Sequence, residues 1–251
     1  MKLKSSKHTI LVQGAPAYYE VIGEGAPVVL VHGLSGSTLW WTRNVQSLAQ
    51  HHTVYLLDLP SFGTMRRARP RFALSTAGSW LLAWMEAVGL KQADFIGHSM
   101  GGFICLWIAT HHASIVSRLV LVSPAIFSET YPLTSYFVRL LKAIRELTPH
   151  FFPILLYDAL RAGPFTLLHA ASELIREDLQ EEIKAVEAPT LLIWGANDTL
   201  VPVSKGYVLR ETMKHARLLV IERAGHVSMF DRPQAFNSAV EAYLSGQPVG
   251  V

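Results

Sequence analysis

The stretch that decides the fold is Asp94-Phe95-Ile96-Gly97-His98-Ser99-Met100-Gly101-Gly102, and the apolar run Phe103 to Ile108 follows it directly. We expect it to form a short strand, a sharp turn and a helix, with Ser99 at the turn. Gly97 and Gly101 flank the serine where a Cβ would collide with neighbouring backbone, and glycine tolerates strained backbone angles. The serine is then exposed at the end of a strand, and the N–H groups of the following helix point toward it.

The pattern G-x-S-x-G between a strand and a helix is typical of a nucleophilic serine. Such a serine needs a base to take its hydroxyl proton and an acid to hold that base in the correct tautomer. In a parallel sheet these groups lie past the carboxyl ends of strands, where the loops converge. His226 follows an expected strand at 217–221, and Asp198 follows another at 189–194. We therefore expect a triad of Ser99, Asp198 and His226, in the chain order typical of this turn.

Other acids and nucleophiles fit less well. Past the strand that ends at Val122, the first carboxylate is Glu129, which lies in a helical segment. Asp58 also ends an expected strand, but its loop is typical of an aspartate that caps a turn. We expect His98 to pack rather than react, and Cys105 to be a small buried residue of a helix.

Strands and helices alternate along most of the chain, which predicts a parallel sheet with right-handed crossovers. This alternation of strands and helices stops between residues 126 and 187, where apolar residues recur at helical spacing. We expect residues 1–125 and 188–251 to form one core, with 126–187 as an inserted helical cap. Besides the elements on either side of Ser99, the expected strands are 9–13, 17–22, 28–31, 54–57, 118–122, 189–194 and 217–221, and the expected helices are 38–50, 75–88, 203–213 and 232–244.

Composition bounds the class of protein. The chain has 251 residues, half of them hydrophobic, which suits one core with a sub-domain. The formal charge is +3 with scattered Lys and Arg, so we expect no nucleic-acid partner. A single cysteine and the lack of metal-binding spacings predict no metal and no cofactor. The first ten residues lack a signal-peptide core and no apolar run could span a membrane. We expect a cytoplasmic monomer or homodimer without a membrane partner.

Several motifs together resemble the α/β-hydrolase family over nearly the whole chain. They are Gly97-His98-Ser99-Met100-Gly101-Gly102, His32-Gly33, Asp198 and Gly225-His226. The resemblance implies a mostly parallel central sheet flanked by helices, with a helical cap over the active site. It also implies an oxyanion hole made by the backbone N–H groups of Leu34 and Met100.

Within that family, individual residues argue against some subfamilies. Haloalkane dehalogenases and epoxide hydrolases resemble this chain but carry an aspartate at the position of Ser99. The meta-cleavage-product hydrolases typically have Asn before the serine and Trp after the histidine, where this chain has His98 and Val227. Ser61 stands where a glycine is usual. The resemblance implies a carboxylesterase or lactonase, with a C–C bond hydrolase, a cofactor-free perhydrolase and a slow-turnover ligand receptor as alternatives.

The 126–187 segment is rich in aromatic residues. We expect most of them to fill the core of the segment and some to face Ser99. The predicted pocket lining is Trp40, Phe127, Tyr131 and Phe137. The other large aromatics of the segment are Tyr136, Phe151, Phe152, Tyr157 and Phe165. A mostly apolar, closed pocket would prefer small to medium, uncharged esters or lactones.

Overall fold

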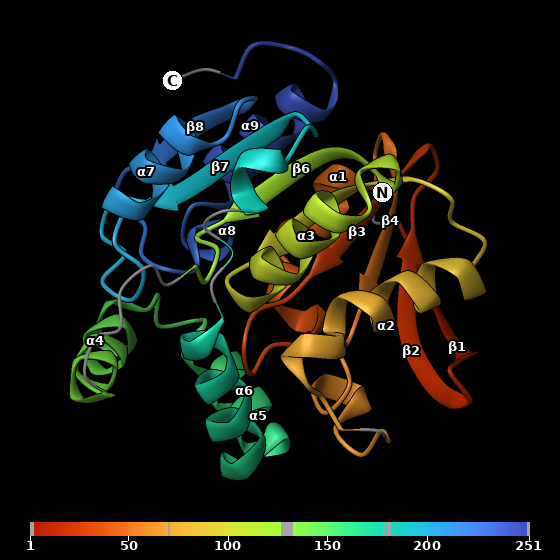
Figure 1. Ribbon diagram of the computed structural model, residues 1–251, viewed down its shortest axis with the longest axis horizontal. Coiled ribbons are helices and arrows are strands. Elements are labelled where there is room, and N and C mark those ends of the chain that lie inside the picture. The colour runs from red at the N-terminus through yellow and green to blue at the C-terminus, as the bar shows by residue number, and fades with distance from the viewer. Residues whose placement is uncertain (1–2, 70, 127–132, 178, 180–181, 250–251) are drawn as a thin grey trace.

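The computed structural model describes residues 3–69, 71–126, 133–177, 179 and 182–249. Within these residues, eight strands form one sheet in the order β1-β2-β4-β3-β5-β6-β7-β8 (Figure 1). The β1–β2 and β2–β4 pairs are antiparallel and the others are parallel, which confirms the expected mostly parallel sheet. The strands are β1 (Ser6–Val12), β2 (Ala15–Ile22), β3 (Ala26–Val31), β4 (His52–Leu57), β5 (Ala93–His98), β6 (Val116–Val122), β7 (Thr190–Gly195) and β8 (Ala216–Ile221).

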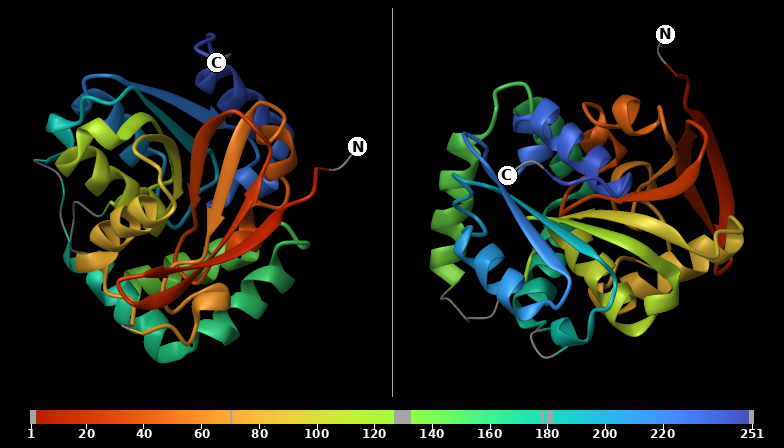
Figure 2. Two further views of the ribbon diagram at one scale, coloured as in Figure 1. Left: turned by 90° about the vertical axis from the view of Figure 1, so that its right-hand side faces the viewer. Right: turned by 90° about the horizontal axis from the view of Figure 1, so that it is seen from above.

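Helices cover both faces of this sheet, which is why its central strands are continuous apolar runs. The side chains of Val28 to Val31 in β3 are fully buried. One apolar layer includes α2 (Leu74–Ala87), α3 (Met100–His111) and α7 (Ser204–Thr212). The other includes α1 (Val45–Leu48), α8 (Ser228–Asp231) and α9 (Pro233–Leu244), and Figures 1 and 2 show the two layers on opposite sides of the strands. Loops at the carboxyl ends of the strands are left free to build a site.

The prediction of one continuous helix over residues 38–50 is wrong. The structure has a 3₁₀ turn η1 (Thr38–Trp41) and the separate short helix α1 instead. Their ends are held by different parts of the molecule. Asp58 accepts a hydrogen bond from the Thr38 N–H (2.8 Å), and the Asn44 side chain donates to the Met229 carbonyl (2.8 Å). Tertiary contacts therefore override a helical pattern that looked continuous.

Three helices follow the sixth strand: α4 (Leu133–Glu146), α5 (Phe152–Ala162) and α6 (Pro164–Arg176). We call α4–α6 the helical insertion. Its helices lie beyond the strands, with α5 and α6 side by side and α4 to the left of them in Figure 1. A 3₁₀ turn, η4 (Glu182–Ala185), precedes the return to the sheet, and two more are η2 (Gly63–Met65) and η3 (Ala113–Ile115). None of the helices in the described ranges has the length and apolarity needed to cross a membrane.

Hydrogen bonds join the insertion to separate parts of the core. Glu173 accepts from the Leu74 N–H (2.9 Å), Thr148 donates to Asp231 (2.6 Å), and Ser37 donates to Asp158 (2.7 Å). Thr199, next to Asp198, also donates to Glu146 at the end of α4 (3.0 Å). The first of these hydrogen bonds concerns the start of α2, which was expected at residue 75, and Ser75 does not cap this helix. The helix begins at Leu74, and the carboxylate of Glu173, far away in the sequence, accepts from the Leu74 N–H, one of the first-turn donors that have no acceptor within the helix.

Candidate active site

Ser99 lies between the end of β5 and the start of α3, with φ 51° and ψ −115°. This left-handed backbone is unusual for a residue with a side chain and costs energy that the surroundings must offset. The flanking glycines explain how the turn closes. A Cβ on Gly97 would lie 2.5 Å from the Gly101 carbonyl oxygen, and one on Gly101 would lie 2.3 Å from the Val31 carbonyl oxygen. Only glycine fits at either position.

Four other non-glycine residues with positive φ lie just past parallel strands. Their φ values are 64° at Ser35, 72° at Ser61, 42° at Ser123 and 55° at Arg223. The value at Ser61 explains why a glycine is usual there. The Ser61 hydroxyl also accepts a hydrogen bond from the Phe72 N–H (2.9 Å), which a glycine could not do. The carboxyl edge of the sheet is thus where backbone strain is concentrated.

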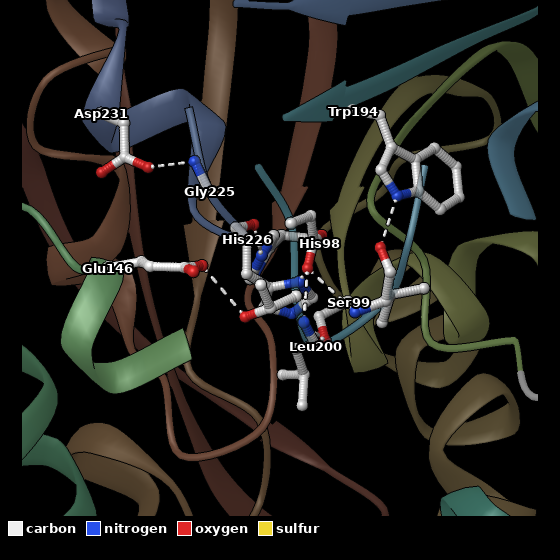
Figure 3. A network of polar contacts seen from close by, with 11 residues as sticks. His98, Ser99, Glu146, Trp194, Leu200, Gly225, His226 and Asp231 are labelled. Carbon is white, nitrogen blue, oxygen red and sulfur yellow. Dashed lines mark hydrogen bonds and ion pairs between the residues drawn. The ribbon is translucent and has the colours of Figure 1, made fainter. Parts of the chain in front are cut away.

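Ser99, His226 and Asp198 form one hydrogen-bonded chain at this edge, and Figure 3 shows the serine and histidine together. The Nδ1 of His226 lies 2.8 Å from the Asp198 carboxylate, and its Nε2 lies 3.0 Å from the Ser99 hydroxyl. Because a carboxylate only accepts, Nδ1 carries the proton and Nε2 is free to accept from Ser99. The imidazole is therefore in the tautomer that a general base requires.

Asp198 is held in place by backbone donors. Its second oxygen accepts from the N–H groups of Leu200 (3.0 Å) and Val201 (2.9 Å), and its side chain is fully buried. Both oxygens of the carboxylate are therefore used, and its orientation toward His226 is set by the loop that follows β7. On the histidine loop, Asp231 accepts from the Gly225 N–H at 2.8 Å (Figure 3).

His98 was expected to pack. It is fully buried, and it also makes a hydrogen bond. Its Nε2 lies 2.9 Å from the His226 carbonyl oxygen, so Nε2 carries the proton and Nδ1 does not. Burial, and then the nearby His226 ring, keep the pKa of His98 well below its usual value. A neutral His98 therefore supports the backbone of His226.

The loop after β3 carries Leu34, one of the two expected oxyanion donors. The Gly36 N–H bonds to the Gly33 carbonyl (3.0 Å), which closes a turn around Leu34. His32 braces that turn. Its Nε2 accepts from the Leu59 N–H (3.0 Å), so its Nδ1 carries the proton and donates to the Gly33 carbonyl (2.8 Å). Burial lowers the pKa of His32, which keeps this neutral form.

Met100, the other expected oxyanion donor, is the first residue of α3. The first N–H groups of a helix have no acceptor within the helix, so its N–H is available. Two neighbouring expectations are confirmed. Asp58 caps its loop by accepting from the Thr64 N–H and hydroxyl (both 2.7 Å), as well as from Thr38. Cys105 is buried in α3, where burial raises the pKa of its thiol.

Of the four aromatic residues predicted to line the pocket, the structure describes the side chain of Trp40 alone. Trp40 is buried, with its ring centroid 5.5 Å from that of His98 and 5.1 Å from that of Phe151. Phe127 and Tyr131 lie outside the described residues. Phe137 is in α4, but its side chain is likewise outside them.

The expectation that the insertion's aromatics are enclosed is wrong for three of them. Phe152, Tyr157 and Phe165 are 46%, 51% and 83% exposed. α5 and α6 use Asp158, Ala170 and Leu174 as buried residues instead, so their aromatic positions fall on the outer side.

Asp158 is a residue that the sequence analysis missed. Its side chain is buried in α5, and its Oδ2 accepts from the Ser37 hydroxyl (2.7 Å) and the Trp40 indole N–H (3.1 Å). Burial is the largest cause that raises its pKa, to about 6. One signal was available: it is a lone acidic residue in the otherwise apolar run 154–160.

Known proteins of one family resemble this chain. The model of the alpha/beta hydrolase family matches residues 28–239, most of the chain. The chain belongs to the α/β-hydrolase family. A putative carbamate hydrolase from Caulobacter sp. (strain K31) is 29% identical, over 92% of this chain and 96% of that protein. A pimeloyl-[acyl-carrier protein] methyl ester esterase from Vibrio atlanticus is 25% identical, over 90% of this chain and 97% of that protein.

A solved structure of a membrane phospholipase A, described as a bacterial virulence factor, is similar over 98% of this chain and 86% of that chain, with a TM-score of 0.82 and 25% identity. Together with the family match, these similarities show that the chain is a hydrolase.

Proposed function

We propose that this hydrolase cleaves carboxylic esters or lactones through an acyl-enzyme on Ser99. The observation that carries the proposal is the position of His226 between Ser99 (3.0 Å) and Asp198 (2.8 Å), in the tautomer that can accept the serine proton. The similarity to proteins named as a methyl ester esterase and a carbamate hydrolase supports acyl chemistry of this type.

In the proposed mechanism, His226 takes the Ser99 proton while the serine oxygen bonds to the acyl carbon. The negative charge that develops on the acyl oxygen is bound by the N–H groups of Leu34 and Met100. His226 then gives its proton to the leaving alcohol, or to the ring oxygen of a lactone, which stays attached. Water, activated by the same histidine, releases the acid and restores Ser99. The helical insertion acts as a cap over these steps.

A serine-directed phosphonate tests the nucleophile. It should add once, at Ser99. Ser99→Ala should abolish labelling and lower kcat/KM by about 10⁶-fold, and Asp198→Asn should lower it less, by about 10⁴-fold, because the acid acts through orientation. Ser123→Ala is a matched control, since Ser123 follows the neighbouring strand β6 on the same rim. Labelling of another residue, or full activity in Ser99→Ala, would disprove the mechanism.

A series of p-nitrophenyl esters and lactones tests the substrate class. Buried Trp40 supports a mostly apolar pocket. Each buried CH₂ contributes about 0.8 kcal/mol, so kcat/KM should rise severalfold per carbon until the pocket is full. We propose an optimum at medium acyl length and an uncharged substrate. Highest activity on emulsified long-chain lipids, or a requirement for an anionic substrate, would contradict this.

A further inference from the structure

The helical insertion places one carboxylate against the loop that carries Leu34. Asp158 is fully buried, and a single oxygen of its side chain, Oδ2, accepts from both Ser37 (2.7 Å) and Trp40 (3.1 Å). Its other oxygen, Oδ1, is buried and has no hydrogen-bond partner among the residues that the structure describes. A buried acceptor without a partner is costly, and in a native protein it calls for an explanation.

Both donors belong to the turn that follows Leu34. The Ser37 hydroxyl also accepts from the Leu39 N–H (3.3 Å), so its orientation sets the start of η1. The Trp40 ring lies beside His98, whose own Nε2 bonds to the His226 carbonyl. Asp158 thus contacts the hydroxyl that sets the start of η1 and the ring that lies beside His98.

This loop needs support from outside. Ser35, next to Leu34, has φ 64°, a strained angle for serine. On the core side the loop is held by His32, which donates to the Gly33 carbonyl, and by Asp58, which accepts from Thr38. Asp158 holds the same loop from the side of the insertion.

We propose that Asp158 is a positioning residue, which holds Ser37 and Trp40 so that the Leu34 N–H is aimed at the acyl oxygen. The oxyanion hole is then complete only when the insertion is docked on the core. This inference rests on the proposed function, and it explains a buried carboxylate that an apolar residue would replace at lower cost. The raised pKa of Asp158, caused mainly by burial, is consistent with that cost.

The test compares Asp158→Ala, Asp158→Asn and Glu173→Ala. Glu173 is a matched control because it is a carboxylate of the insertion that bonds to the core elsewhere, at Leu74. Asp158→Ala should lower kcat about 10- to 100-fold with a much smaller change in KM, because the oxyanion exists only in the transition state. Asp158→Asn should restore most of kcat, since its one carbonyl oxygen can accept from both donors. Glu173→Ala should leave kcat unchanged.

Hydrogen exchange provides a readout that does not depend on turnover. Amides of residues 33–41 should exchange faster in Asp158→Ala than in Glu173→Ala or Asp158→Asn. Ser37→Ala should reproduce part of the effect and add little to Asp158→Ala. The inference is overturned if loop exchange is unchanged in Asp158→Ala, or if its kcat matches that of Glu173→Ala while Ser99 is still labelled by the phosphonate. Failure of labelling in the unmodified enzyme would refute the serine mechanism instead, and the exchange data would still decide the role of Asp158.

Discussion

Asp158 also has a consequence for stability. Its carboxyl is buried between the insertion and the core, facing Ser37, Trp40 and Asp58, with Arg161 on its own helix. Burial raises its pKa from 3.8 to about 6. Between these values the folded protein holds the proton and the unfolded chain does not, so the contribution of Asp158 to stability is lost as pH rises through this window.

We therefore predict that Asp158→Asn gains stability relative to the unmodified protein as pH rises from about 4 to 7, by up to about 3 kcal/mol. Thermal unfolding of both proteins at several pH values measures this difference, and groups that titrate alike in both cancel. A stability difference that does not change with pH would show that folding does not raise the pKa of Asp158.

At the scale of the helix, the start of α2 depends on a contact made by another element. The N–H of Leu74 bonds to Glu173 in α6, and no side chain caps the helix locally. We predict that Glu173→Ala lowers the stability of the protein by about 1 kcal/mol, as the loss of a helix cap does. Ser75→Ala should have almost no effect, because Ser75 is exposed within the first turn. Chemical unfolding of both variants measures the two changes, and equal losses would contradict this assignment.

The elements that the sequence predicted well are those whose signal is local. Runs such as Val28–Val31 indicate buried parallel strands, and the glycines around Ser99 indicate the turn that the structure contains. The interrupted helix at 38–50 and the α2 cap could not be predicted, because Asp58, Met229 and Glu173 reach these segments only in the folded chain. Ser99, Asp198 and His226 could be proposed together because each directly follows a strand of the same sheet. Asp158, in contrast, lies in the insertion helix α5. No strand end in the sequence indicates that its side chain would lie near the carboxyl edge of the sheet.

Among the residues that the structure describes, the three most exposed large apolar side chains lie on the insertion. Leu160, Phe165 and Leu168 are 74%, 83% and 69% exposed on α5 and α6. We predict that replacing all three by Ser changes stability by no more than about 0.5 kcal/mol each and leaves KM for a soluble medium-chain ester unchanged. Thermal unfolding and steady-state kinetics test this. Phe151→Ala is the contrasting variant, since Phe151 is buried against Trp40 and should cost about 3–5 kcal/mol. A raised KM in the triple variant would place these side chains in the pocket.

The hydrogen bonds that join the insertion to separate parts of the core limit how this enzyme can be redesigned. Exchanging residues 133–176 for the corresponding helices of a relative would remove Glu146, Thr148, Asp158 and Glu173 together. Thr199, Asp231, Ser37 and the Leu74 N–H would each lose the hydrogen bond that it makes to the insertion. A chimera built to change substrate preference therefore has to inherit the core loops along with the helices. On the proposed role of Asp158, the helices that would set substrate specificity also hold the catalytic geometry.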